Sequence, residues 1–343
     1  MTKTANDYQD LICEIEPRSA FLTPLAADTL WGSLVWACRW VYGEAALSRL
    51  LEAQSDGSPA LLVSDAMPDG WLPRPQQPVP VAAIRQTVTA RGYVEGSPAY
   101  FEALAAAKEW LQQPYLKRRD VYSLLAGRQS QSQLMARDLS AFVQRRAEHK
   151  KLESAVATAP RRHNVIDRQR GTSLEENGLY LQSEAWLQNR WCIYLRTTCD
   201  IDWLKPLFTY VSETGFGKRA STGLGHFTVR RLRPLATHEQ FPAVADANGF
   251  LTLSSAYVPH NNEVSGQAYY SLHLKRGKLG AAMATTEKGG YLKRPVTMCN
   301  AGSVFATDAP PRKWYGSLLD DMHKELAEVK QYGYAFPLAG KLF

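Results

Sequence analysis

The chain has 343 residues, 45% of them hydrophobic, which suffices for two ordinary domains with a sizeable core. No apolar run approaches the length of a membrane span, and the N-terminus lacks the apolar region of a signal peptide, so a cytoplasmic protein without membrane association is expected. Five cysteines, an odd number without a C-x-x-C pair, argue against a zinc site or a disulfide framework and favour free thiols.

The positive charge is concentrated in one part of the chain. The formal net charge is +7, and residues 115–170 carry 13 Lys and Arg against 5 Asp and Glu. This excess of 8 accounts for the whole net charge. A localised basic stretch is typical of proteins that bind a phosphate backbone, although a solvated helical insertion would have the same composition.

The first half of the chain predicts a mixture of strands and helices. Strands are predicted at 11–15 and 61–63, and helices at 28–42 and 97–111, from apolar spacing. Five prolines from Pro68 to Pro80 disfavour a regular element between them. Residues 121–125 are again apolar, whereas 128–159 are polar and basic without convincing helix caps.

The second half begins with a strand at 191–195, a helix at 202–212 with Asp202 as its N-cap, and a strand at 226–232. This order fits an α+β fold with a ferredoxin-like βαββαβ unit over 1–235, interrupted by an insertion at about 66–186. Prolines near 234–242 mark a boundary before a second unit, 240–343. Strands at 250–257, 268–274 and 295–298 and an amphipathic helix at 317–330 are predicted there.

A glycine-rich stretch lies between the helix at 202–212 and the strand at 226–232. Paired glycines at its two ends permit positive φ and enclose two cations and two hydroxyls, a composition suited to holding phosphates. A dinucleotide or P-loop would open a helix instead of following one, so a chain of phosphates fits better than one pyrophosphate. An ordinary helix C-cap with solvated cations is the alternative. The residues assigned to this site are Gly215, Phe216, Gly217, Lys218, Arg219, Ser221, Thr222, Gly223 and Gly225.

The chain resembles the RAMP superfamily, the RNA-binding proteins of CRISPR systems, and within it the subunit of type III-A (Csm) complexes that caps the CRISPR RNA. The glycine-rich stretch is similar to the superfamily's loop. Both lie between a helix and a strand and have the pattern Gly-hydrophobe-Gly, five residues, Gly-hydrophobe-Gly. Further matches lie in order between Asp28 and Phe336: segments 27–34, 61–68, 71–75, 163–173, 293–295 and 302–305. Met67, where the family pattern has Phe, and the segment 298–300 depart from it.

The resemblance implies a second, degenerate ferredoxin-like domain and an RNA-binding role without catalysis. The implied partners are the repeat-derived 5′ handle of the CRISPR RNA, the large polymerase-like subunit and a backbone RAMP subunit. It also favours a second RNA-binding cluster, formed by His163, Asn164, Arg168 and Arg170. A charged loop without a binding role would have the same composition. Ser33 and Arg39 are added because guide RNA contacts the equivalent helix in backbone subunits. Other basic patches at 275–278 and 293–294 fit either an RNA path or solvated hairpins.

Three alternatives remain at this point. The chain could be a repeat-processing endoribonuclease of the same superfamily with His163 or His226 as acid or base, the equivalent subunit of a type III-B complex, or a mononucleotide-binding regulator using the glycine-rich loop. No acidic cluster points to a metal, and no cofactor is predicted.

Overall fold

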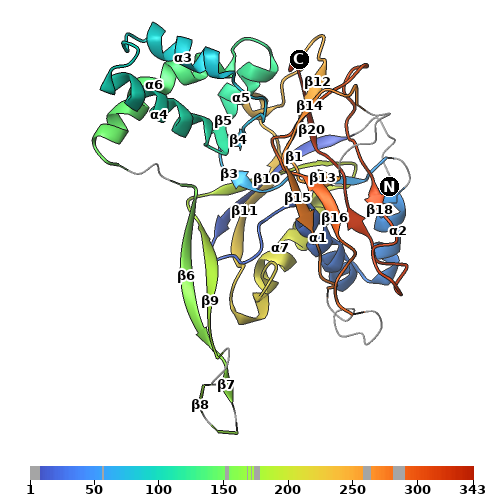
Figure 1. The fold of residues 1–343 in the computed structure, drawn as a ribbon. Coiled ribbons are helices and arrows are strands. Elements are labelled where there is room, and N and C mark those ends of the chain that lie inside the picture. The colour runs from blue at the N-terminus through green and yellow to red at the C-terminus, as the bar shows by residue number, and fades with distance from the viewer. Residues whose placement is uncertain are drawn as a thin grey trace.

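The computed structural model describes residues 8–55, 58–150, 154–167, 169–170, 172–173, 178–257, 264–280 and 290–343. Figure 1 shows three parts: a body of sheets and helices, a lobe formed by helices α3 to α6, and a long hairpin of β6 and β9 that extends away from the body. The molecule is mixed α+β, as the sequence predicts.

An antiparallel sheet lies at the centre of the body. Its order is β11 (Phe227–Pro234), β1 (Gln9–Pro17), β10 (Trp191–Thr197) and β2 (Leu61–Val63), and β3 (Met67–Pro68) also pairs with β10. The four predicted strands of this unit are therefore confirmed. The two middle strands lie in the interior of the sheet, and their residues Leu11, Ile193 and Leu195 are fully buried.

Two helices, α1 (Ala27–Tyr42) and α7 (Ile201–Thr214), pack against each other beside this sheet. They pack because each presents a leucine stripe, with Leu30 and Leu34 on α1 and Leu204 and Leu207 on α7 all buried. The predicted N-cap of α7 was two residues late: Asp200 is the cap, and its carboxylate accepts the amide of Asp202 at 2.7 Å. A third helix, α2 (Glu44–Ser55), follows α1 directly.

The N-terminus of α1 is capped by a residue distant in sequence. The cap position itself, Ala26, offers no side chain, and Asp65 instead accepts the amide of Ala27 at 2.7 Å. The Asp65 carboxylate also accepts the amide and the hydroxyl of Ser255 at 2.9 and 2.8 Å. Burial raises the pKa of Asp65 from its ordinary value. This carboxylate therefore joins α1 to the C-terminal half of the chain.

The insertion after β3 forms the helical lobe. A short ribbon of β4 (Trp71–Pro73) and β5 (Tyr115–Lys117) leads to it, and its helices are α3 (Val81–Ala90), α4 (Pro98–Leu111), α5 (Arg118–Leu125) and α6 (Gln131–Ala147). Helix α6 corrects the prediction of an uncapped polar stretch. Ser130 and Gln133 form a capping box, and Leu134, Met135 and Leu139 are buried.

The long hairpin, here called the arm, pairs β6 (Val156–Asn164) with β9 (Leu179–Leu187) over nine residues each. Beyond it, β7 (Ile166–Asp167) pairs with β8 (Thr172–Ser173) at the tip. The arm was not predicted as strands, because its sequence lacks a period-two pattern. Both faces are largely exposed, including the large side chains of Ile166, Leu179 and Leu181.

The C-terminal half is built from short strands. One sheet has the order β14 (Ala268–Tyr269), β17 (Val304–Ala306), β12 (Gly249–Thr252), β20 (Pro337–Gly340), and another β13 (Ala256–Tyr257), β16 (Val296–Cys299), β15 (Leu272–Lys275). The predicted boundary near 235–240 and the second ferredoxin-like domain stay predictions. One hydrophobic core includes buried residues of both halves, such as Leu62 and Phe336.

The predicted amphipathic helix at 317–330 is wrong. Leu318–Leu319 forms β18, which pairs with β19 (Gln331–Tyr332), and turns occupy the residues between them. The imidazole of His323 accepts the amides of Glu325 and Leu326 at 3.3 and 3.2 Å, which stabilises a turn in place of a helix. The apolar spacing that resembled a helix instead places Met322 and Val329 in a small buried cluster.

Candidate nucleic-acid interface

The glycine-rich loop begins where α7 ends, as predicted. Gly215, Gly217, Gly223 and Gly225 all have positive φ, and Arg219 is also left-handed, with φ of 62°. At two of these positions a side chain would collide with neighbouring atoms. A Cβ on Gly225 would lie 2.0 Å from the carbonyl oxygen of Phe216, and one on Gly217 would lie 2.5 Å from Cβ of Thr23. The loop therefore has the backbone that its sequence indicates.

The loop is held tightly at its base. Phe216 is buried, so this predicted contact residue is a core anchor, and its amide donates to Gly225 at 2.9 Å. The segment Ala20–Thr23 holds the other side. The carbonyl of Ala20 accepts the Gly225 amide at 2.8 Å, and the hydroxyl of Thr23 accepts the Lys218 amide at 2.9 Å.

The middle of the loop presents polar groups to solvent. The side chains of Lys218, Ser221 and Thr222 are exposed around a short 3-10 turn, η1 (Ala220–Thr222). Within the described residues, no hydrogen bond uses the amides of Gly217, Arg219, Ala220 or Ser221 as donors. These donors and cations together form an arrangement that suits phosphate oxygens.

Arg219 joins the loop to the arm. Its guanidinium donates to Nδ1 of His163 at 3.2 Å and to the hydroxyl of Tyr180. The rings of His163 and Tyr180, which face each other across β6 and β9, stack with centroids 5.2 Å apart. Two clusters predicted separately in the sequence therefore meet at one place. Tyr180 was missed, because only the strand register places it beside His163.

Two other residues of the predicted cluster lie in β6 and near the tip of the arm. Asn164 ends β6, Arg170 lies at the tip, and both are exposed, each with an interaction partner in the molecule. Arg168 lies outside the described residues. The described members of the predicted cluster thus extend from β6 to the tip of the arm.

Ser33 and Arg39 both have partners within or next to α1. The Ser33 hydroxyl donates to the carbonyl of Thr29 at 2.9 Å, and Arg39 forms an ion pair with Glu44 at 2.7 Å. Neither contacts the glycine-rich loop in the described structure.

One lysine in each of the other two basic patches, Lys275 and Lys293, has a polar partner within the protein. Lys275 pairs with the buried Asp28 at 2.9 Å, and Lys293 donates to the carbonyl of Lys330 at 2.6 Å. Burial lowers the pKa of Lys293 to about 8. Their internal partners explain the lysines without RNA.

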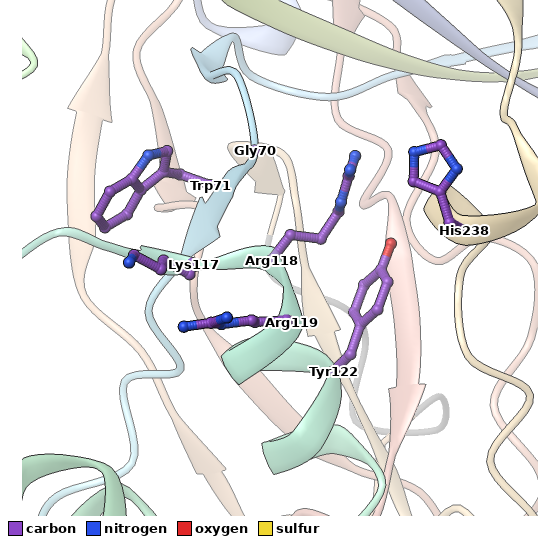
Figure 2. A pocket seen from close by; sticks show the side chains of 7 residues that line it. All are labelled: Gly70, Trp71, Lys117, Arg118, Arg119, Tyr122 and His238. Atoms are coloured by element: carbon purple, nitrogen blue, oxygen red, sulfur yellow. The ribbon is translucent and has the colours of Figure 1, made fainter. Parts of the chain in front are cut away.

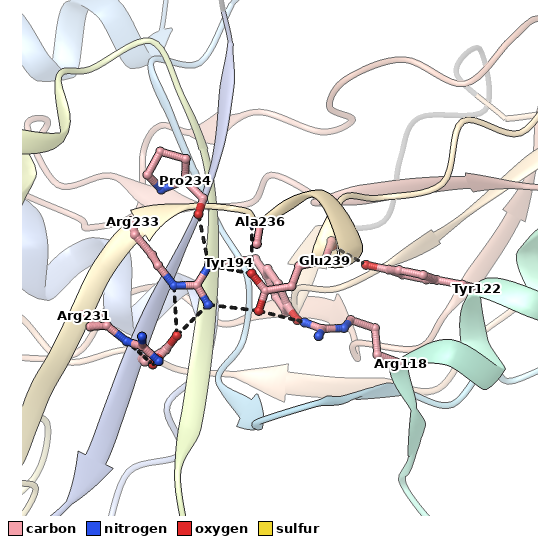
Figure 3. Close-up of polar contacts among 9 residues, drawn as sticks. Arg118, Tyr122, Tyr194, Arg231, Arg233, Pro234, Ala236 and Glu239 are labelled. Carbon is pink, nitrogen blue, oxygen red and sulfur yellow. Dashed lines mark hydrogen bonds and ion pairs between the residues drawn. The ribbon is translucent and has the colours of Figure 1, made fainter.

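A network of arginines and glutamates joins β11 to β1 and to α5 (Figure 3). Arg231 and Arg233 both contact the buried Glu14, at 2.9 and 2.7 Å. Arg233 also binds the buried Glu239, which Arg118 approaches to 3.7 Å. The hydrogen bond from Arg233 lowers the pKa of Glu239 to about 2. The alternate positions of Arg231 and Arg233 put both on one face of β11, whereas their carboxylate partners lie far apart in the chain.

The described residues also bear on metal binding and on membrane insertion. No group of three or more His, Cys, Asp or Glu side chains there could hold a metal ion. No helix in the same residues is long and apolar enough to cross a bilayer.

The fold is shared with subunits of type III-A CRISPR complexes. No family model and no curated protein matches the sequence. A chain of the crystal structure of a Csm1–Csm4 cassette with AMPPNP matches with a TM-score of 0.55 at 17% identity, over 98% of this chain and 99% of that one. A chain of a Csm3–Csm4 subcomplex of the type III-A interference complex matches with a TM-score of 0.56 at 12% identity, over 94% and 98%. At these identities the likeness establishes the fold, and the resemblance seen in the sequence is confirmed at that level.

Proposed function

We propose that the protein is an RNA-binding structural subunit of a type III-A CRISPR effector complex that holds the repeat-derived 5′ handle of the CRISPR RNA. One observation carries this proposal: Arg219 of the glycine-rich loop contacts His163 and Tyr180 of the arm. A phosphate-binding loop and an aromatic pair thereby lie side by side. The shared fold with chains of Csm complexes supports it.

The loop would bind phosphates and the arm would bind bases. Open amides, Lys218 and two hydroxyls suit a phosphate backbone, which carries no sequence information. The Tyr180 ring, 38% exposed and backed by His163, offers a stacking surface for an unpaired base. Because a handle is constant while the spacer varies, a subunit at this position gains from reading bases.

The main test is the binding of a labelled handle RNA, compared with scrambled RNA of equal length at two salt concentrations. The variant Lys218→Ala/Arg219→Ala should bind at least about tenfold more weakly and with a shallower salt dependence, because two cations near phosphates are lost. The matched control is Lys108→Ala/Arg128→Ala, which removes two exposed cations from the helical lobe. Equal binding by all three proteins would refute the role of the loop.

We further propose that the role involves no catalysis. Nδ1 of His163 accepts from Arg219, and its Nε2 is buried, so neither nitrogen is available to transfer a proton. The other candidate, His226, is half-buried and packs against Gly215. Metal-independent cleavage of repeat RNA that His163→Ala or His226→Ala abolishes would establish the endoribonuclease instead.

The partners follow from the same proposal. The similar chains come from complexes named for Csm1 with Csm4 and for Csm3 with Csm4. We therefore place this chain between a large polymerase-like subunit and a backbone RAMP subunit. Co-expression of the three subunits should give one particle, and failure of this chain to co-purify with either would count against the assignment.

A further inference from the structure

A cavity of about 390 Å³ lies where β4, β5 and α5 meet the segment around His238 (Figure 2). Its volume falls in the range of small-molecule sites. The lining residues come from three distant parts of the chain, so no pattern along the sequence indicates the cavity. They are Gly70, Trp71, Lys117, Arg118, Arg119, Tyr122 and His238.

The cavity is strongly cationic. Three consecutive cations, Lys117, Arg118 and Arg119, line it, and its lining contains no carboxylate. Lys117 and Arg119 are exposed, and the carboxylate nearest to Arg119, that of Asp120, lies at 3.8 Å and is already bound by Arg137 at 2.8 Å. The cations also stand at the first turn of α5, where the helix dipole favours an anion. The cavity therefore suits a negatively charged group.

An aromatic surface lies beside the cations. Trp71 is the cross-strand partner of Lys117 in the β4–β5 ribbon, and its side chain is half-exposed. In Figure 2 the side chains of Lys117 and Arg119 extend toward the same side as the indole of Trp71, while Arg118 and Tyr122 point toward His238. A flat apolar ring next to guanidinium and ammonium groups is the combination that binds a base and its phosphate together.

The cavity is linked by shared carboxylates to β11, the strand that follows the glycine-rich loop. Arg118 shares Glu239 with Arg233, and Arg233 shares Glu14 with Arg231, whose side chain is 61% exposed (Figure 3). Arg231 and Arg233 stand on β11, whereas Arg118 is on α5. The Trp71 ring beside the exposed Lys117 and Arg119 favours a nucleotide over an acidic peptide.

We infer that this cavity is a second binding site, for one nucleotide unit, with its phosphate between Lys117 and Arg119 and its base against Trp71. The source of the unit is either a nucleotide of the bound RNA or a free nucleotide. The first case rests on the proposed function, because it extends the same RNA past the loop. The second case is independent of it.

The test uses the full-length protein with two probes, the labelled handle RNA and ATP. Lys117→Ala/Arg119→Ala should weaken binding of one probe about tenfold, the equivalent of one charge-assisted hydrogen bond. Both side chains are exposed, so folding is expected to survive, and thermal melting checks this. Lys108→Ala/Arg128→Ala again controls for net charge. Trp71→Ala should weaken the same probe, and Trp71→Phe should restore most of the affinity because it keeps a ring.

The outcomes separate the two sources. A loss confined to RNA assigns the site to the RNA chain, and a loss of saturable ATP binding assigns it to a free nucleotide. Unchanged binding of both probes would overturn the inference, while a loss in Lys218→Ala/Arg219→Ala would still support the proposed function. A variant that binds both probes normally but no longer co-purifies with a protein partner would show an acidic protein surface in the cavity, which also overturns it.

Discussion

At the residue scale, the glycines of the loop have different reasons to be glycine. Gly225 lies against the backbone of Phe216, and both its space and its positive φ exclude a side chain. Gly223 has a similar φ of 88°, yet no atom lies within 4 Å of the position a Cβ would take. The pattern in the sequence indicated positive φ at both. It could not distinguish them, because the contact depends on how the loop closes.

Gly225→Ala should therefore cost much more than Gly223→Ala. A left-handed alanine alone costs about 1 kcal/mol, so Gly223→Ala should lower the free energy of unfolding by about that amount. Gly225→Ala adds a backbone clash and should cost more than about 2 kcal/mol while also weakening RNA binding. Urea unfolding of the two variants measures the difference, and equal losses would show that the loop can move aside.

At the element scale, the sequence predicted those helices and strands in which apolar residues follow a recognisable pattern. The strands of the central sheet contain short apolar segments, and α1 and α7 have regular leucine spacing, so these elements were found. Helix α6 was missed, although Ser130 and Gln133 carry the capping-box signal. The arm was missed for a physical reason: a hairpin exposed on both faces has no hydrophobic alternation to detect.

The contact between β11 and α5 through Glu239 should make stability depend on acid pH. Its pKa is lowered from 4.5 to about 2, so its stabilising effect is complete above pH 4.5 and is lost as the pH falls toward 2. The loss should approach about 3 kcal/mol. Glu239→Gln should be less stable at pH 7 and should lack this part of the decline. Denaturant unfolding at pH 7, 5 and 3 measures it, and parallel curves for both proteins would contradict the role of Glu239.

At the scale of the whole molecule, the two halves share their interior. The hydroxyl of Tyr332 accepts the amide of Val63 at 3.0 Å, and Gln331 donates to the buried Asp28 at 2.9 Å. Together with the contact between Asp65 and Ser255, these bonds cross the predicted boundary near 235–240. The sequence marked that boundary with prolines, but prolines indicate a break in the chain's regular structure and say little about what packs across it.

A fragment ending at residue 235 should therefore fail to fold by itself. It would leave apolar residues of the shared core uncovered and the Asp65 carboxylate without Ser255. We expect weak, non-cooperative thermal unfolding or aggregation of this fragment, and recovery of a single sharp transition when residues 236–343 are supplied on a second chain. A cooperative transition of the fragment alone would establish two independent domains.

The short segment Ala20–Thr23 touches both parts of the proposed RNA site. Its ends hold the glycine-rich loop, and between them Phe21 exchanges two backbone hydrogen bonds with Ala185 of the arm, at 2.8 and 2.9 Å. The length of this four-residue segment therefore sets the distance between the glycine-rich loop and the arm. Adding or removing a single residue in this segment would change that spacing by about 3 Å. In the proposed RNA site, such a change would alter how far the phosphate-contacting loop lies from the base-contacting arm.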